Sequence, residues 1–223
     1  MYEFHCDAIL FDLDGVLVDS MQVIERQWQL WAAHNQINMQ AIIDVWHGRR
    51  AFEIIQLVAP HLDTSAEARI VAAAEAADRE GLQVYPGAQH LLTRLPATHW
   101  AIATSGPLAV ASARLTHAGL PFPQIFVTGD DVQRGKPSPD PYLLAAARLE
   151  LPPQRCVVIE DAPAGIEAGL AAGAQVIAIA STNPTEELQR ANAVAAKLSD
   201  LRVTVHPHGD YRLTIQVPTS NSR

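Results

Sequence analysis

Hydrophobic positions along the chain follow two different periods. Short apolar runs bounded by turn residues are typical of buried strands, and they occur at residues 8–11, 99–104, 125–128, 156–159 and 175–179. Segments with apolar positions three or four residues apart lie between these runs and predict helices at residues 87–95, 107–118, 139–149 and 163–172. Strands that alternate with helices favour a parallel sheet with helices on both faces, so we expect an α/β core.

A long block, residues 18–82, separates the first two predicted core strands and contains no strand pattern. An amphipathic helix is predicted at residues 20–34 by apolar side chains at three- and four-residue intervals: Met21, Ile24, Trp28 and Trp31. Further helical patterns cover residues 39–46, 51–58 and 65–80, the last rich in strong helix formers. We therefore expect a small helical bundle inserted after the first strand.

The last part of the chain returns to the alternation of period two that half-buried strands show. Residues 203–206 and 211–217 alternate in this way and flank the turn-forming segment 207–210. We expect a C-terminal β-hairpin at the edge of the sheet, with a structural role, and frayed residues at 219–223.

Composition narrows the classes of partner. The chain of 223 residues has a formal net charge of −8 and no block of basic residues, so no nucleic-acid partner is expected. The N-terminal residues lack the basic region and apolar stretch of a signal peptide, and the uncharged segment 168–185 is broken by Gly, Asn and Pro. We therefore expect no membrane partner and a cytoplasmic location. Cys6 and Cys156 adjoin or lie in apolar runs and are expected to be buried free thiols.

Two acids, Asp12 and Asp14, follow the first predicted strand of the core. Side chains two residues apart in an extended chain point the same way, so the carboxylates are expected side by side at the end of a central strand. Gly15 allows the chain to turn away immediately. Acids that merely cap the next helix are the structural alternative. Open α/β sheets place their chemistry at this edge, which favours a functional pair.

Polar residues also follow later strands. Thr104 and Ser105 end the second core strand, where a hydroxyl and free backbone amides suit an anion, although the same residues are common helix caps. Lys136, one of only two lysines in the chain, stands between a glycine and a proline that restrict the backbone. A solvated loop lysine is the alternative at that position.

Glu160 and Asp161 end the fourth predicted core strand. Carboxylates are the hard oxygen ligands that Mg²⁺ prefers, together with water and a substrate phosphate. The alternative is a pair of acids stabilised by the N-terminus of the next helix. These two acids, Asp12 and Asp14 would repel one another at one sheet edge unless cations offset them, so we expect Mg²⁺ and Lys136 to balance the carboxylates and a bound phosphate.

In order and spacing, four segments resemble the motifs of the haloacid-dehalogenase (HAD) superfamily. They are Asp-Leu-Asp-Gly-Val-Leu-Val-Asp-Ser at 12–20, Thr-Ser-Gly at 104–106, Gly-Lys-Pro-Ser-Pro-Asp-Pro-Tyr at 135–142 and Glu-Asp-Ala-Pro-Ala-Gly at 160–165. The resemblance covers essentially the whole chain. It implies a Rossmann-like catalytic core formed by residues 1–16 and 84–223, with residues 17–83 as an inserted α-helical cap domain.

A closer resemblance rests on His47-Gly48-Arg49-Arg50 and on residues 158–166. In these segments the chain is similar to bacterial sugar- and hexitol-phosphate phosphatases and to glycerol-phosphate phosphatases. The resemblance implies a phosphoric monoester hydrolase that acts on small sugar or polyol phosphates through an aspartyl-phosphate. It also implies Mg²⁺ as cofactor, and we expect the enzyme to be a monomer.

The resemblance implies a role for each motif residue. Asp12 is the implied nucleophile, and Asp14 the acid and base that serves the leaving alcohol and the attacking water. The implied phosphate ligands are Thr104, the amide of Ser105 and Lys136. The implied metal ligands are Asp12, the backbone carbonyl of Asp14, Asp161 and, directly or through water, Glu160.

Substrate choice is expected in the helical cap. His47, Arg49 and Arg50 lie in one loop between predicted helices and are the candidate substrate contacts. The alternative is that the arginines are solvated or pair with acids such as Glu53. Which arginine points inward is left open by the sequence.

The same residues argue against several other activities of the superfamily. Dehalogenases of the superfamily lack the second acid, so Asp14 argues against them, and a phosphonate hydrolase would need a cap lysine that residues 18–82 do not contain. A non-catalytic phosphate-binding module typically loses an acid, and none is lost here. A sugar phosphomutase of the β-phosphoglucomutase type stays open, although Ala51 lies in the loop region where such mutases usually carry an arginine.

Overall fold

The computed structural model describes residues 1–218 and has an α/β architecture built on a six-stranded parallel sheet. The strands run in the spatial order β6 (Ile125–Val127), β5 (Trp100–Ala103), β2 (Ala8–Phe11), β7 (Cys156–Glu160), β8 (Gln175–Ile179) and β9 (Ala193–Ala195). The predicted α/β class and five of these strands are confirmed, whereas the short edge strand β9 was not predicted. The expectation for residues 219–223 falls outside the described residues.

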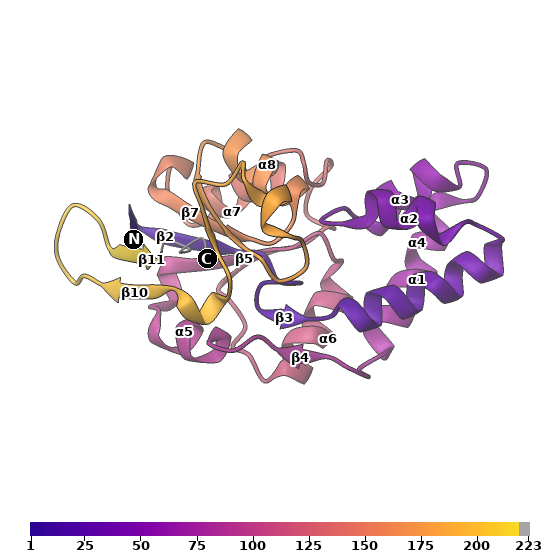
Figure 1. Ribbon diagram of the computed structural model, residues 1–223, viewed down its shortest axis with the longest axis horizontal. Helices are drawn as coiled ribbons and strands as arrows, with labels where there is room; N and C mark the ends of the chain where they lie inside the picture. Colours follow the sequence, from indigo (N-terminus) through magenta and orange to yellow (C-terminus); the bar gives the residue numbers. More distant parts are fainter. Residues whose placement is uncertain (219–223) are drawn as a thin grey trace.

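Helices cover both faces of the sheet because side chains alternate along each strand. Ile9 and Phe11 pack in one hydrophobic cluster with α5 (Ala88–Arg94) and α6 (Leu108–Ala118). Leu10, on the opposite face, packs in a second cluster with α7 (Asp140–Arg148) and α8 (Pro163–Ala171). Figure 1 shows α7 and α8 above the sheet and α5 and α6 below it.

The predicted helical block forms α1 (Met21–Asn35), α2 (Met39–Trp46), α3 (Ala51–Val58) and α4 (Thr64–Ala77). These helices enclose a hydrophobic cluster of their own around Trp28, Trp31 and Ile55, separate from the two clusters of the sheet. Figure 1 shows them as one group beside the carboxyl ends of the strands. The N-terminus of α4 is capped by Asp63, whose carboxylate accepts from the amides of Ser65 and Ala66.

Two short strands join the sheet to the helical block. β3 (Val18–Asp19) pairs antiparallel with β4 (Gln83–Val84), so the outgoing and returning chain lie together. The expectation that residues 18–82 hold no strand is therefore wrong at Val18–Asp19. Two residues carry too little pattern to be recognised from the sequence, because their pairing depends on the distant residues 83–84.

The predicted C-terminal hairpin is present, but its position differs from the prediction. β10 (Arg202–Val205) pairs antiparallel with β11 (Leu213–Val217), and β11 also pairs with the N-terminal strand β1 (Tyr2–Cys6). The hairpin thus belongs to a separate three-stranded sheet rather than to an edge of the parallel sheet. β1 was not predicted, although its buried Phe4 and Cys6 alternate with exposed residues as in other half-buried strands.

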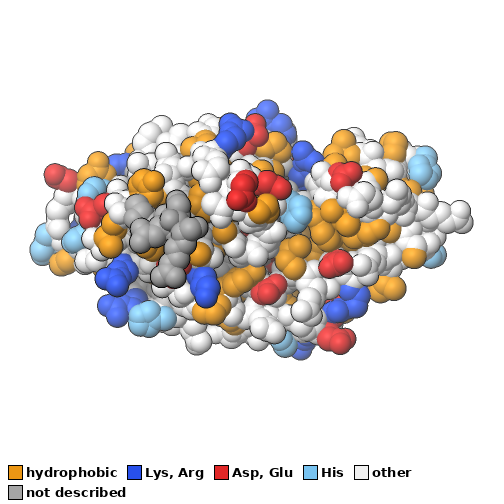
Figure 2. Space-filling model, in the orientation of Figure 1, with side chains coloured by type: hydrophobic (Ala, Val, Ile, Leu, Met, Phe, Trp, Pro, Cys, Tyr) orange, Lys and Arg blue, Asp and Glu red, His pale blue; other side chains and the backbone are white. Residues whose placement is uncertain are grey.

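Three further expectations concern the two cysteines, helices that could cross a membrane, and the distribution of basic side chains. Cys6 and Cys156 are both buried and free, as predicted, and burial raises the pKa of each thiol to about 12. Within residues 1–218, no helix combines the length and the apolar character needed to cross a bilayer. On the face drawn in Figure 2, Lys and Arg side chains are scattered among acidic ones instead of forming one basic patch.

Candidate active site

Asp12 and Asp14 lie where β2 leaves the centre of the sheet. The amide of Asp12 donates to the carbonyl of Ile159 at 2.9 Å, which extends the pairing with β7 and holds the Asp12 side chain at the sheet edge. Gly15 then turns the chain with a φ of 83°, and a Cβ at this position would collide with the Asp161 carboxylate. Glycine is therefore required both for the turn and for the close approach of Asp161.

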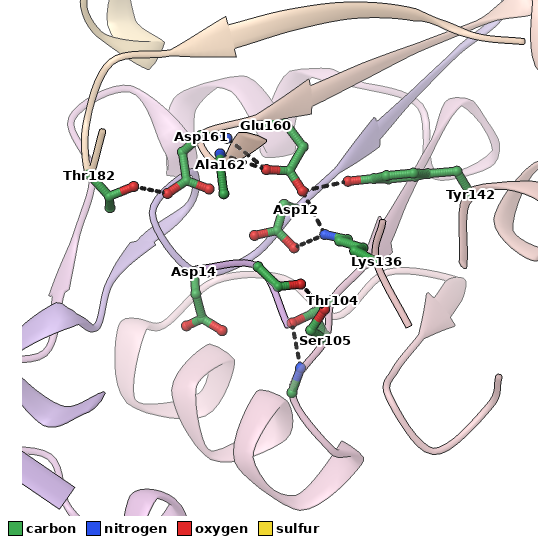
Figure 3. Close-up of polar contacts among 12 residues, drawn as sticks. Asp12, Asp14, Thr104, Ser105, Lys136, Tyr142, Glu160, Asp161, Ala162 and Thr182 are labelled. Atoms are coloured by element: carbon green, nitrogen blue, oxygen red, sulfur yellow. Dashed lines mark hydrogen bonds and ion pairs between the residues drawn. The ribbon is translucent and has the colours of Figure 1, made fainter. Parts of the chain in front are cut away.

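Lys136 lies at the centre of a buried ion cluster. Its Nζ donates to Oδ1 of Asp12 at 2.6 Å and to Oε1 of Glu160 at 2.7 Å, and only 1% of the residue is exposed. Tyr142 of α7 donates its hydroxyl to the same Glu160 oxygen at 2.9 Å. Figure 3 shows the four side chains meeting at the carboxyl ends of the strands. The alternative of a solvated loop lysine is wrong, because Lys136 is buried between two acids.

The pKa values in this cluster indicate an excess of negative charge. Burial raises the pKa of Asp12 to about 7, with Glu160 and Asp14 adding to the shift and Lys136 opposing it. Burial and the neighbouring Glu160 also raise the pKa of Asp161 well above its usual range. The paired acids hold the pKa of Lys136 high although burial opposes its charge. One ammonium group therefore does not compensate all the carboxylates around it.

Carboxylate oxygens of Asp12, Glu160 and Asp161 lie within 4.8 Å of one another, and this group could hold a metal ion. The uncompensated charge and the hard oxygen donors fit a divalent cation such as Mg²⁺. Asp161 is oriented from its other side, since Thr182 donates its hydroxyl to the carboxylate and Asn183 donates to the Asp161 carbonyl at 3.0 Å. Sequence patterns did not reveal either residue.

Glu160 differs from the other two acids because its oxygens are already engaged. Oε1 accepts from Lys136 and Tyr142, and Oε2 accepts from the amides of Asp161 and Ala162 at 2.8 and 3.0 Å. Four donors occupy about the full capacity of a carboxylate, so Glu160 is less available as a direct metal ligand than Asp12 and Asp161 are. These bonds also explain its pKa, which Lys136 and the amides lower although burial opposes them.

The Asp14 carboxylate points away from this group, as Figure 3 shows, and belongs to a second ion cluster. It accepts from the Ser20 hydroxyl at 2.7 Å and from Nη1 of Arg114 at 2.5 Å. Nη2 of Arg114 donates to Oε2 of Glu75 at 2.6 Å, so an arginine of α6 joins Asp14 to a helix of the cap. Burial raises the pKa of Glu75, although Arg114 opposes the shift.

Neither Arg114 nor Glu75 is marked by any motif. Each stands in an amphipathic or alanine-rich helical segment, where a charged residue is normally solvated. Arg114 is nevertheless only 2% exposed. Its two partners, Asp14 and Glu75, come from two distant parts of the chain, so only their meeting in space identifies it.

Thr104 and Ser105 lie beside Asp12 at the end of β5. Thr104 accepts from the amide of Gly106 at 3.1 Å, and Ser105 donates its hydroxyl to the Gly48 carbonyl of the cap at 2.7 Å. The alternative that they cap the next helix is not supported, because the amide of Leu108, the first residue of α6, donates to Asp130 at 2.8 Å.

The two cap arginines take different places. Arg50 pairs with Glu53 at 2.6 Å and donates to the carbonyls of Gly129, Val132 and Gln133 at 3.3, 2.8 and 2.8 Å. Glu53 in turn accepts from the Gly135 amide at 2.9 Å. Arg50 therefore fastens the cap to the loop that precedes Lys136. The alternative of pairing with Glu53 thus holds for Arg50.

Arg49 and His47 line the cavity that covers the Asp12 cluster. Arg49 donates to the Val45 carbonyl at 3.1 Å, and burial lowers the pKa of His47. The core contributes Asp12, Asp14, Thr104, Ser105 and Asp161 to the same cavity. Most of the predicted core and cap residues therefore line one cavity. Arg50 lies outside it, at the contact between cap and core, and Lys136 and Glu160 lie beneath Asp12 and do not line it.

Comparison with known proteins places this site among hydrolases. A family model described as haloacid dehalogenase-like hydrolase matches residues 6–173. Hexitol phosphatase A of Escherichia coli is 43% identical over 210 residues, which cover 92% of this chain and 97% of that protein. Glycerol-1-phosphate phosphohydrolase 2 of Saccharomyces cerevisiae is 37% identical over 192 residues, 79% of this chain and 75% of that protein.

A solved structure agrees with the sequence comparisons. The crystal structure of a hydrolase from Pseudomonas syringae superposes with a TM-score of 0.78 at 28% sequence identity. The match covers 87% of this chain and 95% of that one. Most of this chain therefore has its fold in common with a known hydrolase.

Proposed function

Because the chain belongs to the haloacid dehalogenase-like hydrolase family, we propose that it is a phosphatase that hydrolyses small sugar or polyol phosphates. The observation that carries the proposal is the Asp12 carboxylate, buried at the end of the central strand β2 between Lys136 and two further acids. A buried acid with a cation site beside it suits nucleophilic attack on a phosphate ester.

The proposed metal is Mg²⁺, held by Asp12, Asp161 and the backbone carbonyl of Asp14, with Glu160 acting through water. The acidic cluster fits a divalent metal, and its oxygen donors favour Mg²⁺ over softer ions. When bound, the ion offsets repulsion between an anionic nucleophile and a phosphate dianion.

In the proposed reaction, Asp12 attacks phosphorus and forms an aspartyl-phosphate as the bond to the leaving oxygen breaks. Asp14 gives its proton to that oxygen, and the alcohol departs. Asp14 then takes a proton from the water that attacks the aspartyl-phosphate, which releases inorganic phosphate and restores Asp12. Lys136, Thr104 and the Ser105 amide hold the phosphoryl oxygens through both steps.

The cap supplies substrate selection in this proposal. Residues 17–83 act as the cap domain and residues 1–16 and 84–223 as the core. His47 and Arg49 face the leaving alcohol, which is supported by their place in the cavity wall. Arg50 acts indirectly, since it fastens the cap over the core.

The sugar phosphomutase alternative has less support, because the sequence relatives described above are a phosphatase and a phosphohydrolase. A turnover panel tests both functions. The protein with Mg²⁺ is given hexitol, hexose, deoxyhexose and glycerol phosphates, and released phosphate is measured. With a hexose 1-phosphate, formation of the 6-phosphate is measured as well. Phosphate release is expected to dominate; faster formation of the 6-phosphate would establish the mutase instead.

We further propose that the enzyme acts as a cytoplasmic monomer on small molecules alone. The scattered basic side chains in Figure 2 give no support to nucleic-acid binding on that face. Light scattering at micromolar concentration is expected to give the mass of one chain, 24.2 kDa. A mass of two chains would contradict the monomer.

A further inference from the structure

Two buried N–H donors in residues 1–218 have no hydrogen-bond partner, Nε1 of Trp46 and Nε of Arg114. Trp46 comes from the last turn of α2 in the cap, and Arg114 from α6 in the core. Both residues line the cavity above Asp12. A buried donor without an acceptor is destabilising, so two such donors on residues that line one cavity point to a ligand that supplies the acceptors.

Another tryptophan of the cap shows the contrast. Trp31 donates its Nε1 to Oε2 of Glu67 at 2.7 Å, from α1 to α4. Neither residue lines the cavity. The cap therefore pairs a buried indole N–H with a carboxylate of α4 where the cavity is not involved. The Nε1 of Trp46 lacks such a partner, although the Trp46 side chain lines the cavity.

Glu75 supplies an acceptor in the same wall. It stands two helical turns after Glu67 on α4 and binds Arg114 through Oε2 at 2.6 Å. Among the described residues its Oε1 has no hydrogen-bond partner. The residues of the wall thus hold two unpartnered donors and one free carboxylate oxygen, which together match groups that both accept and donate. Hydroxyl groups are the simplest groups of that kind.

The charges around these residues favour an uncharged alcohol. Arg114 is already paired with both Asp14 and Glu75, so its free Nε offers a hydrogen bond without an unbalanced positive charge. Arg49 is the other cationic side chain of the wall, against four acids: Asp12, Asp14, Glu75 and Asp161. A second anionic group on the substrate would meet Glu75 and Asp14 in a partly apolar cavity, where repulsion is screened weakly.

We propose that Trp46, Glu75 and Arg114 recognise hydroxyl groups of the leaving alcohol and select uncharged polyhydroxy alcohols against those that carry a carboxylate. This inference rests on the proposed phosphatase function and assigns its specificity to residues outside the His47–Arg50 loop. Trp46 and Arg114 donate to hydroxyl oxygens, and Glu75 accepts from a hydroxyl. Apolar side chains of Ile24, Trp28 and Val71 cover the carbon chain.

The test compares W46F and E75Q with two matched controls, W31F and E67Q, which alter the same residue types in the same part of the cap. With Mg²⁺ present, kcat/KM is measured for sorbitol 6-phosphate and for hexyl phosphate, whose leaving alcohol needs a proton as sorbitol does but has no free hydroxyl for these residues. The ratio of the two values is expected to fall about tenfold in W46F and E75Q, as loss of one hydrogen bond to a buried group predicts. The controls are expected to keep the wild-type ratio.

Losses of equal size on both substrates would indicate a structural role and overturn the inference, as would an equal fall in the controls. Thermal melting identifies variants that fail to fold. Trp46 and Glu75 are changed in separate variants, so if one variant fails to fold, the other still tests the inference. If the wild type with Mg²⁺ hydrolyses neither ester, the proposed function fails, and this inference with it. Wild-type turnover with unchanged ratios in W46F and E75Q overturns the inference alone.

A separate measurement tests the proposed preference for uncharged alcohols over alcohols that carry a carboxylate. Sorbitol 6-phosphate and gluconate 6-phosphate differ at the carbon farthest from the phosphate, which carries a hydroxyl in one and a carboxylate in the other. The wild type is expected to prefer the sorbitol ester at least tenfold in kcat/KM, and E75Q to narrow that preference. Equal turnover of the two esters by the wild type would contradict selection for an uncharged alcohol.

Discussion

Residues 1–218 contain two buried ion clusters, each with one base between two acids, and they differ in how they are built. In the first, Lys136 lies between Asp12 and Glu160, all at the carboxyl edge of the sheet. In the second, Arg114 lies between Asp14 of the core and Glu75 of the cap. The first cluster is complete within the core, whereas the second requires the cap to be docked.

If the proposed function holds, this difference separates the residues of the chemical step from those that recognise the substrate. The Lys136 cluster holds the proposed nucleophile within the core: Asp12 and Glu160 stand at the ends of neighbouring strands, and Lys136 reaches both from the loop between β6 and α7. The Arg114 cluster places Asp14 beside a cap residue only when the two parts are together. Changes in the first cluster are expected to abolish the reaction, and changes at the cap seam to weaken it.

The largest effect is expected from Asp12→Asn, which leaves the shape of the site but removes the anionic nucleophile. Activity should fall to background for every substrate, and the melting temperature should stay close to or above that of the wild type, because one buried carboxylate is removed. Released phosphate and thermal melting measure the two properties. Substantial turnover would show that another group attacks phosphorus.

Removal of the metal is expected to have nearly the same effect. Asp12, Glu160 and Asp161 hold more negative charge than Lys136 offsets, so the site without a divalent ion should repel a phosphate dianion. Dialysis against EDTA should stop turnover, and added Mg²⁺ should restore it. Mg²⁺ should also raise the melting temperature, since it binds the folded state. Full activity in EDTA would contradict the metal site.

Asp14→Asn tests the second cluster on its core side. The first step loses its acid and the second its base, so turnover should fall by about 10²–10⁴-fold, the usual contribution of such a group. A good leaving group needs no acid, so with 4-nitrophenyl phosphate the aspartyl-phosphate should accumulate. Intact mass after acid quenching should show one added phosphate. Unchanged turnover would remove Asp14 from proton transfer.

A comparison of Arg50→Ala with Arg49→Ala tests the cap side. Arg50 donates to core carbonyls, so its loss should loosen cap docking and lower kcat/KM by about tenfold for sugar phosphates and aryl phosphates alike. Arg49 lines the cavity, so its loss should raise KM for sugar phosphates while changing the aryl phosphate little.

These roles, Arg49 as a substrate contact and Arg50 as a link between cap and core, would be contradicted if Arg50→Ala affected only sugar phosphates. Similar effects of both variants on both substrates would mean that the seam and the cavity wall act as one unit. Either result is read from KM and kcat measured separately for the two substrates.

The sequence by itself determined the α/β architecture, the helical insertion and the residues gathered around Asp12. Periods of two and of three to four residues follow from the geometry of strands and helices, and they are visible in any single segment. Asp12, Lys136 and Glu160 were also visible, because each follows a strand or lies in a restricted loop and such positions share one sheet edge. The pairing of β1 with β11 was not visible, since it joins the two ends of the chain.

Only the tertiary structure decided what the other polar residues do. It separated Arg49 from Arg50, which are adjacent in the chain and chemically identical, by placing one in the cavity wall and the other at the seam. It also joined Asp14, Glu75 and Arg114, whose positions in the sequence carry no common pattern. The physical reason is that burial and pairing of charges depend on distances between elements, and local sequence periodicity does not contain those distances.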